Sequence, residues 1–181
     1  MLMKIKFATN LLTCMLVSIA VLVAKAPTAI ADSTPSNLVN ELTAPVADGA
    51  REPSLSTMTD GRVLMSWTEP QGNGFAVKVA ISDGSGWSKP QTIVARDDLF
   101  VNWADFPSTI ALADGTLVAH WLQINGDASY QYDVKIAISY DEGKTWSKPI
   151  IPHDDRSKRE HGFVTLVPTQ SDAFMAVWLD G

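Results

Sequence analysis

Two charged residues stand at the same register of a repeated pattern, and they are the first candidates for chemistry. Arg51 lies sixteen residues before Trp67, and Asp105 lies sixteen residues before Trp121. A guanidinium group binds a planar carboxylate through two parallel hydrogen bonds, whereas an aspartate accepts hydrogen bonds from hydroxyl and amide groups. Together they indicate a polar site at this register.

The same register recurs a third time before Trp178. The equivalent position there is Gly162, which directly follows Glu160 and His161. We therefore add Glu160 and His161 to the candidate substrate-binding residues. Charges at loop ends are also commonly solvated, so a surface role for this pair stays open.

One aromatic residue stands apart from the others. Trp103 lies two residues before Asp105, outside the predicted strands, and is a candidate platform for a sugar ring. By contrast Trp67, Trp121 and Trp178 share one position inside strands, which favours structural packing.

The histidines do not have the spacing of a metal site. Glu160 and His161 are adjacent, but His120 and His153 are not close to them in a regular ligand pattern. Core or solvent-exposed roles are favoured for all three histidines, so the sequence predicts no metal and no cofactor.

A second motif is structural. Residues 139–146 read Ser-Tyr-Asp-Glu-Gly-Lys-Thr-Trp, between an alternating apolar run and Ser-Lys-Pro. Asp141 can accept backbone N–H groups, Gly143 can adopt a positive φ, and the Ser139 and Thr145 hydroxyls can add hydrogen bonds. Trp146 then leaves the turn as an apolar anchor.

This motif belongs to a repeat. Residues 78–93 match 135–151, and the earlier copy is one residue shorter. Its degenerate motif consists of Ser82, Asp83, Gly86 and Trp87. A period near fifty residues made of short strands indicates a β-propeller rather than a helical solenoid.

The strands that this repeat predicts form about two and a half four-stranded blades, so the fold class is an all-β, incomplete propeller. Blade one spans about 51–96, blade two about 104–153 and a partial blade three about 160–181. Predicted strands lie at 54–59, 63–68, 76–82, 91–95, 108–113, 117–124, 132–139, 149–152, 162–169 and 174–179. A ring of this size cannot close, so we expect further blades beyond residue 181 or self-association to cover the open edge.

The first 31 residues have the pattern of a secretory signal peptide. Lys4 and Lys6 precede an apolar run at 11–24, and Ala29-Ile30-Ala31 is a small-residue cleavage site. Residues 32–50 then form a polar linker or lead-in. We expect an exported protein, periplasmic or secreted, with no membrane span once the signal is removed. An uncleaved anchor is the less favoured alternative.

Composition excludes one class of partner. The chain has 14 basic and 20 acidic residues, and cleavage of the signal would remove three lysines and no acid. No basic patch remains to hold a nucleic-acid backbone, so nucleic acid is excluded as a partner.

The motif at 139–146 resembles the Asp box of the sialidase (neuraminidase) superfamily, whose BNR repeats build β-propellers. Ala50-Arg51-Glu52-Pro53 is similar to the segment that opens the sialidase propeller. The resemblance implies that Arg51 is one of three arginines that clamp the sialic acid carboxylate, and that Asp105 faces the acyl-amino pocket. It also implies an acid/base aspartate after the second strand of blade one, where this chain offers only Glu69. The tyrosine nucleophile and its glutamate would belong to later blades.

The resemblance therefore predicts an exported protein of the exo-α-sialidase lineage that acts on terminal sialic acid or a related sugar. Hydrolysis by these residues alone is not expected, because Arg51 and Asp105 are only part of the catalytic set. The alternative is a non-catalytic Asp-box propeller that binds glycan or protein in the cell envelope. Carbohydrate is the expected ligand of the enzyme lineage, whereas the alternative leaves both glycan and protein open.

Overall fold

A computed structural model describes residues 4–8, 39–170 and 172–181 of the chain. Two units are distinguished, and the smaller contains β1 (Lys4–Ala8) and β2 (Val39–Thr43) as an antiparallel pair with Lys4 opposite Thr43. Strand β2 thus falls within the segment predicted to be a linker. The apolar run at 11–24 and the predicted cleavage site lie outside the described residues, so the signal peptide stays a prediction.

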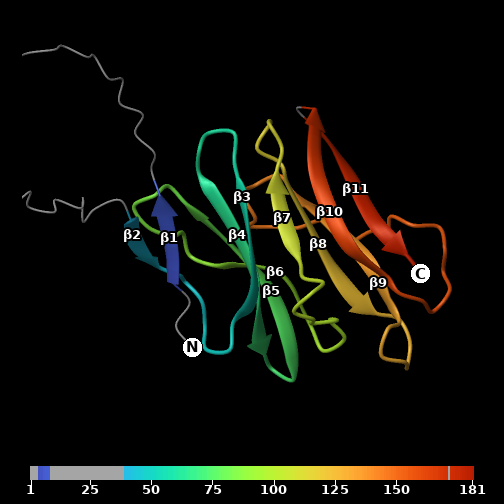
Figure 1. Cartoon of the computed structure of the whole chain (residues 1–181). Helices are drawn as coiled ribbons and strands as arrows, with labels where there is room; N and C mark the ends of the chain where they lie inside the picture. Colours follow the sequence, from blue (N-terminus) through green and yellow to red (C-terminus); the bar gives the residue numbers. More distant parts are fainter. Residues whose placement is uncertain (1–3, 9–38, 171) are drawn as a thin grey trace, which may run out of the picture. The chain divides into compact units, whose positions relative to one another are not determined.

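The larger unit begins at Ala44 and contains three antiparallel sheets, which follow one another along the chain (Figure 1). The first sheet has the strand order β3 (Arg51–Thr57), β4 (Val63–Gln71), β5 (Gly74–Ser82) and β6 (Gln91–Arg96). The second contains β7 (Ser108–Ala111), β8 (Leu117–Ile124) and β9 (Tyr132–Ser139). The third contains β10 (His161–Gln170) and β11 (Ala173–Asp180). The predicted fold class, all-β with successive antiparallel blades, is confirmed.

The first strands of the three sheets lie beside one another. Strand β3 contacts β7, and β7 contacts β10. The Ser56 hydroxyl on β3 donates to the Thr109 carbonyl on β7 at 2.8 Å. This is the arrangement of innermost strands in a propeller, and it brings the start of each first strand to the same end of the blades.

Each interface between neighbouring sheets has its own apolar core. Between the first and second sheets, the buried side chains include Leu64, Val79 and Trp121. Between the second and third sheets, they include Val118 and Tyr132. Strand β8 contributes to both cores because its side chains alternate between the two faces of the sheet. Six of its eight residues are buried in a continuous run, from Leu117 to Leu122.

The turn at 139–146 contains the hydrogen bonds that its sequence predicts. The Asp141 carboxylate accepts the Thr145 N–H at 2.8 Å, the Thr145 hydroxyl at 2.7 Å and the Ser139 hydroxyl at 2.8 Å. Gly143 has a φ of 83°, and the Trp146 indole N–H donates to its carbonyl at 3.0 Å. These bonds close the hairpin after β9 through side chains rather than through further strand pairing.

The degenerate copy in blade one closes in a shorter form. Asp83 accepts the N–H of Ser85 at 2.9 Å, and Ser82 accepts the N–H of Gly84 at 3.1 Å. The positive φ, 92°, is that of Gly84 and not of Gly86, the residue that alignment matches to the motif glycine. The full turn has two left-handed residues after its aspartate, Glu142 and Gly143 with φ of 58° and 83°, and the shorter copy has one, Gly84.

Two local differences separate the predicted and observed strands. The fourth strand expected at 149–152 is reduced to one bridge, in which Ile136 and Ile150 exchange backbone hydrogen bonds at 2.9 and 3.0 Å. Strand β3 starts at Arg51, three residues before the predicted start, because a bulge lets it continue toward its N-terminal end. Within the described ranges every regular element is a strand, and no helix is available to span a membrane.

We predict that Asp141→Asn lowers the stability of the fold in a pH-dependent way. Hydrogen bonds from Thr145 lower the pKa of Asp141 from 3.8 to about 2. A depressed folded-state pKa stabilises the protein above the unfolded pKa, and this contribution is lost as the pH falls through the folded pKa. The urea midpoint of Asp141→Asn should therefore lie below that of the wild type at neutral pH, with the gap closing near pH 2.

The exposed Asp154→Asn variant is the control, because it makes the same change of charge outside the turn. A gap for Asp141→Asn that is constant with pH would contradict the assignment of the stabilisation to the ionised carboxylate.

Candidate functional site

An open cleft of about 520 Å³ lies at the start of the first strand of blade one. It joins residues from β3 with residues from the connection between β6 and β7, which are separated by about fifty positions in the sequence. The lining residues are Arg51, Glu52, Pro53, Val101, Asn102, Trp103 and Phe106. Arg51 and Trp103, both predicted as substrate-binding residues, therefore share one cleft.

Arg51 is held at the cleft by its local backbone and by an aromatic ring. Its guanidinium carbon lies 5.2 Å from the centre of the Phe75 ring, and its Nε donates to the Gly49 carbonyl at 3.4 Å. The register shift between Arg51 and Ser54 turns the strand at this point. Cation–π contact limits the motion of the guanidinium while the side chain stays exposed to a ligand.

Trp103 stands on a loop that closes on itself. The Asn102 side chain accepts the N–H of Ala104 at 2.8 Å, and the Asp105 N–H points to the Asn102 carbonyl at 3.4 Å. This compact turn leaves the Trp103 side chain 85% exposed. A large aromatic ring exposed at the edge of a cleft is suited to binding another flat, partly apolar surface.

Glu52 is a residue of the cleft that sequence reasoning missed. Its φ is 58°, a left-handed conformation that is unusual for a residue with a side chain. Burial raises the pKa of its carboxyl, although a hydrogen bond with Thr68 and the charge of Arg51 act in the opposite direction. A carboxyl group with a raised pKa inside a cleft is a candidate proton donor.

The left-handed conformation recurs in the third sheet. Phe163 has a φ of 53° and directly follows Gly162, the residue sixteen positions before Trp178. It lies within the bulge between Gly162 and Thr165. Glu52 follows the register position Arg51 in the same way. The repeat therefore includes a backbone feature that residue types alone do not reveal.

Asp105 and Glu160 meet in a second, buried group. The Tyr132 hydroxyl lies 2.8 Å from Glu160 Oε1 and 3.4 Å from Asp105 Oδ2. Tyr132 is the residue that sequence reasoning missed here, and its ring stacks on Phe100 with centroids 4.0 Å apart. Asp105 is buried and is not among the residues that line the cleft. The acyl-amino role that the resemblance implies for it stays a prediction.

Two members of this group, Asp105 and Tyr132, have raised pKa values. Burial raises the pKa of Asp105, and the nearby charge of Glu160 raises it further. Burial also raises the pKa of Tyr132, as do its hydrogen bonds to the two carboxyls. A phenol whose pKa is raised is not an activated nucleophile. The group therefore connects blade two to blade three rather than presenting a reactive oxygen.

The packing around this group is tight at Gly162. A Cβ atom at this position would collide with Asp105 Oδ2 and lie 3.0 Å from the Tyr132 ring. Gly162 thus allows β10 to approach both side chains closely.

Glu69 and His161 lie elsewhere. Glu69 Oε2 accepts the indole N–H of Trp67 at 2.9 Å and the Ala47 N–H at 3.3 Å, and Lys78 Nζ is 3.7 Å from Oε1. Glu69 does not line the cleft, and these contacts tie it to its neighbours in the first sheet, so its catalytic role stays a prediction. His161 is fully buried and bonds to Asp180, apart from the cleft.

His120 is also buried, with its Nδ1 3.1 Å from the Ser108 hydroxyl. Burial lowers the pKa of His120 to about 4, so the ring is neutral at neutral pH. It belongs to the core of blade two and is not exposed to solvent.

The chain matches no family model and no curated protein. Among solved structures it is similar to an alpha-L-arabinanase of Penicillium chrysogenum complexed with arabinobiose, with 18% identity and a TM-score of 0.45. The match covers 68% of this chain and 39% of the arabinanase, so the chain spans less than half the length of that protein. The proposals below depend on the residues of this chain alone.

We predict that Tyr132→Phe destabilises the fold by about 1–3 kcal/mol, because the buried Asp105 and the half-buried Glu160 lose the Tyr132 hydroxyl as a hydrogen-bond partner. The phenylalanine ring preserves the stacking on Phe100, so the effect isolates the hydroxyl group. Urea unfolding at neutral pH measures it. The control, Tyr140→Phe, removes the hydroxyl of a side chain that is 80% exposed and should change stability by less than about 0.5 kcal/mol. Equal effects of the two substitutions would contradict the prediction.

Proposed function

We propose that this protein is an exported, sialidase-like β-propeller that binds a terminal sialic acid or a related acidic sugar in the cleft of Arg51 and Trp103. One observation carries the proposal. The exposed guanidinium of Arg51 on β3 and the 85% exposed indole of Trp103 on the connection between β6 and β7 line the same cleft. Export is proposed from the sequence pattern of the first 31 residues.

The chemistry of the two side chains matches the two halves of such a ligand. The guanidinium of Arg51 offers parallel donors to the sugar carboxylate, and Phe75 already holds it, so less rotational freedom is lost on binding. The Trp103 ring offers an apolar face to the C–H surface of the pyranose. The net charge of −6 makes this a placed positive charge rather than part of a general basic surface.

Glycoside hydrolysis is the second candidate function, and Glu52 favours it. Its raised pKa suits a group that protonates the leaving oxygen. A retaining sialidase also needs a nucleophile activated by a carboxylate. Tyr132 is buried with a raised pKa, so these residues support binding more strongly than turnover.

We predict that the full chain binds 3′-sialyllactose more tightly than lactose, measured by calorimetry at neutral pH. Arg51→Ala should weaken the binding of sialyllactose about 10- to 100-fold, since a charge-assisted hydrogen bond contributes about 1.5–3 kcal/mol. Trp103→Ala should weaken both sugars. Lys89→Ala and Tyr140→Ala, exposed side chains outside the cleft, are the matched controls and should leave affinity unchanged.

Equal affinity for the two sugars, or no loss on Arg51→Ala, would overturn the proposal. Release of a fluorophore from a sialoside separates the second candidate from the first. If turnover occurs, Glu52→Gln should lower kcat while the affinity for sialyllactose is retained.

A further inference from the structure

Three buried side chains, none of them in the cleft, converge beside the third sheet. Asp133 lies near the start of β9, His153 lies on the connection between the second and third sheets, and His161 begins β10. Their exposed fractions are 8%, 4% and 0%. One possible ligand atom from each lies within 4.8 Å of those of the other two.

The hydrogen bonds of the two imidazoles fix their tautomers. His153 Nδ1 lies 2.7 Å from the Asp155 carbonyl oxygen, and His161 Nδ1 lies 2.6 Å from Asp180 Oδ1. Both partners only accept hydrogen bonds, so each Nδ1 carries the proton. In the neutral ring the lone pair is then on Nε2.

Both Nε2 atoms are buried, and neither has a hydrogen-bond partner among the described residues. A buried acceptor without a partner loses its hydrogen bond to water and gains nothing in return, so two such atoms on neighbouring rings call for an explanation. A histidine whose Nδ1–H donates to a carboxylate or a backbone carbonyl while Nε2 faces an ion is the usual arrangement of a metal ligand.

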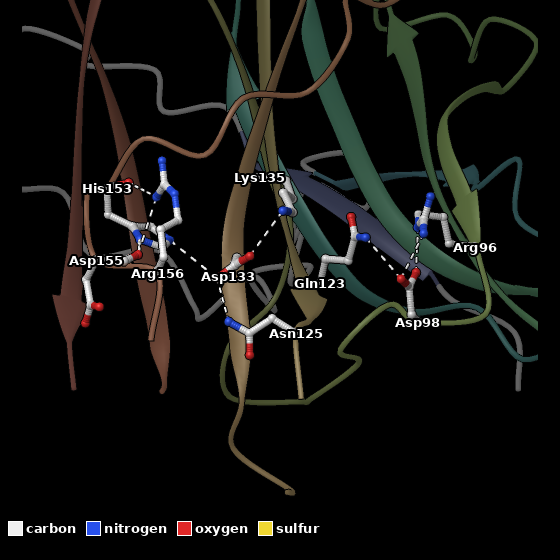
Figure 2. Close-up of polar contacts among 9 residues, drawn as sticks. All are labelled: Arg96, Asp98, Gln123, Asn125, Asp133, Lys135, His153, Asp155 and Arg156. Carbon is white, nitrogen blue, oxygen red and sulfur yellow. Dashed lines mark hydrogen bonds and ion pairs between the residues drawn. The ribbon is translucent and has the colours of Figure 1, made fainter. Parts of the chain in front are cut away.

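Asp133 supplies the negative charge. Figure 2 shows its carboxylate between Asn125, Lys135 and His153. Oδ1 accepts from Asn125 Nδ2 at 2.6 Å, and Oδ2 lies 3.2 Å from Lys135 Nζ. These contacts orient the carboxylate and leave lone pairs on its oxygens.

The separation of the ligand atoms favours an ion over a direct contact. His153 Nε2 and Asp133 Oδ1 are 3.9 Å apart, which is too long for a hydrogen bond. Ligand bonds of about 2.0–2.2 Å around a tetrahedral zinc ion place neighbouring ligand atoms roughly 3.4 Å apart. A shift of about half an ångström would bring this pair to that spacing.

The surroundings are consistent with a cation. The His153 and His161 rings stack with centroids 4.0 Å apart, an arrangement that two protonated rings would oppose by repulsion. Trp178 packs at 6.3 Å from the His153 ring and shields it from solvent. Asp180 adds a second carboxylate, which contacts His161. The nearby cations already have partners, since Lys135 contacts Asp133 and the Arg156 guanidinium donates to the His153 carbonyl.

We propose that Asp133, His153 and His161 bind a divalent transition-metal ion of the zinc type through one carboxylate oxygen and the two Nε2 atoms. Two imidazoles and one carboxylate are a ligand set that zinc accepts, with a fourth position for water, and that calcium and magnesium do not favour. The site would join β9, the connection after blade two and β10. It does not depend on the proposed binding of sugar.

Zinc titration of the full chain after treatment with a chelator tests the proposal. We expect one Zn²⁺ per chain by calorimetry and a melting temperature that rises with the zinc concentration, because an ion that binds only the folded state stabilises it. His153→Gln and His161→Gln should each weaken binding about 100-fold or more, since loss of a ligand should cost at least as much as the 10- to 100-fold loss of an outer-shell partner. The control, His120→Gln, alters the one other histidine, also buried, and should keep the affinity.

Histidine ¹⁵N spectra of the wild-type chain give a second test that needs no variant. Zn²⁺ should shift the Nε2 resonances of two of the three histidines and leave that of His120 in place. Absence of stoichiometric binding, binding that survives both glutamine substitutions, or a preference for Ca²⁺ over Zn²⁺ would each overturn the proposal.

Discussion

Burial of the second sheet on both of its faces is the constraint on which the rest of the structure depends. Alternate side chains of β8 enter two different cores, Trp121 with the first sheet and Val118 with the third. Full burial of side chains of this size contributes about 1.5–3 kcal/mol each, so the two interfaces are the main source of cohesion in this part of the chain. They also set where β3, β7 and β10 begin, and hence which polar residues can meet.

Features that depend on local sequence could be predicted. Strands at 117–124 and 132–139 are observed within the predicted bounds, because apolar alternation and flanking turn residues are strong signals over such lengths. The hydrogen bonds of Asp141 and Thr145 follow for the same reason, since both partners lie within four residues. The strand predicted at 149–152 is reduced to a single bridge at Ile150, because a strand in this position depends on its neighbour and not on its own residues.

Features that depend on contacts between blades could be predicted only in part. The register of the repeat indicates Arg51 directly, and it indicates Trp103 because this residue lies two positions before Asp105. Arg51 and Trp103 share a cleft. The same register could not show that Asp105 turns toward Tyr132, because these two residues are 27 positions apart and meet only once the strands of blade two have paired. Nor could spacing reveal the grouping of Asp133, His153 and His161. Whether the two imidazoles can bind an ion depends on which ring nitrogen is protonated. That is decided by the acceptors of the two Nδ1 atoms, the Asp155 carbonyl and Asp180 Oδ1.

The register of the strands separates the two ends of each blade. Arg51 pairs with Thr68 at one end of β4, while Val63 at the other end pairs with Ser82, where the degenerate turn begins. The Arg62–Glu142 ion pair, with its atoms 2.9 Å apart, links the turns of neighbouring blades at this far end. The residues that close the turns at 83–87 and 139–146 are thus not the residues that line the cleft. Selection can therefore alter ligand preference at one end while the opposite end preserves the ability to fold, and a library of cleft variants would start from an undisturbed scaffold.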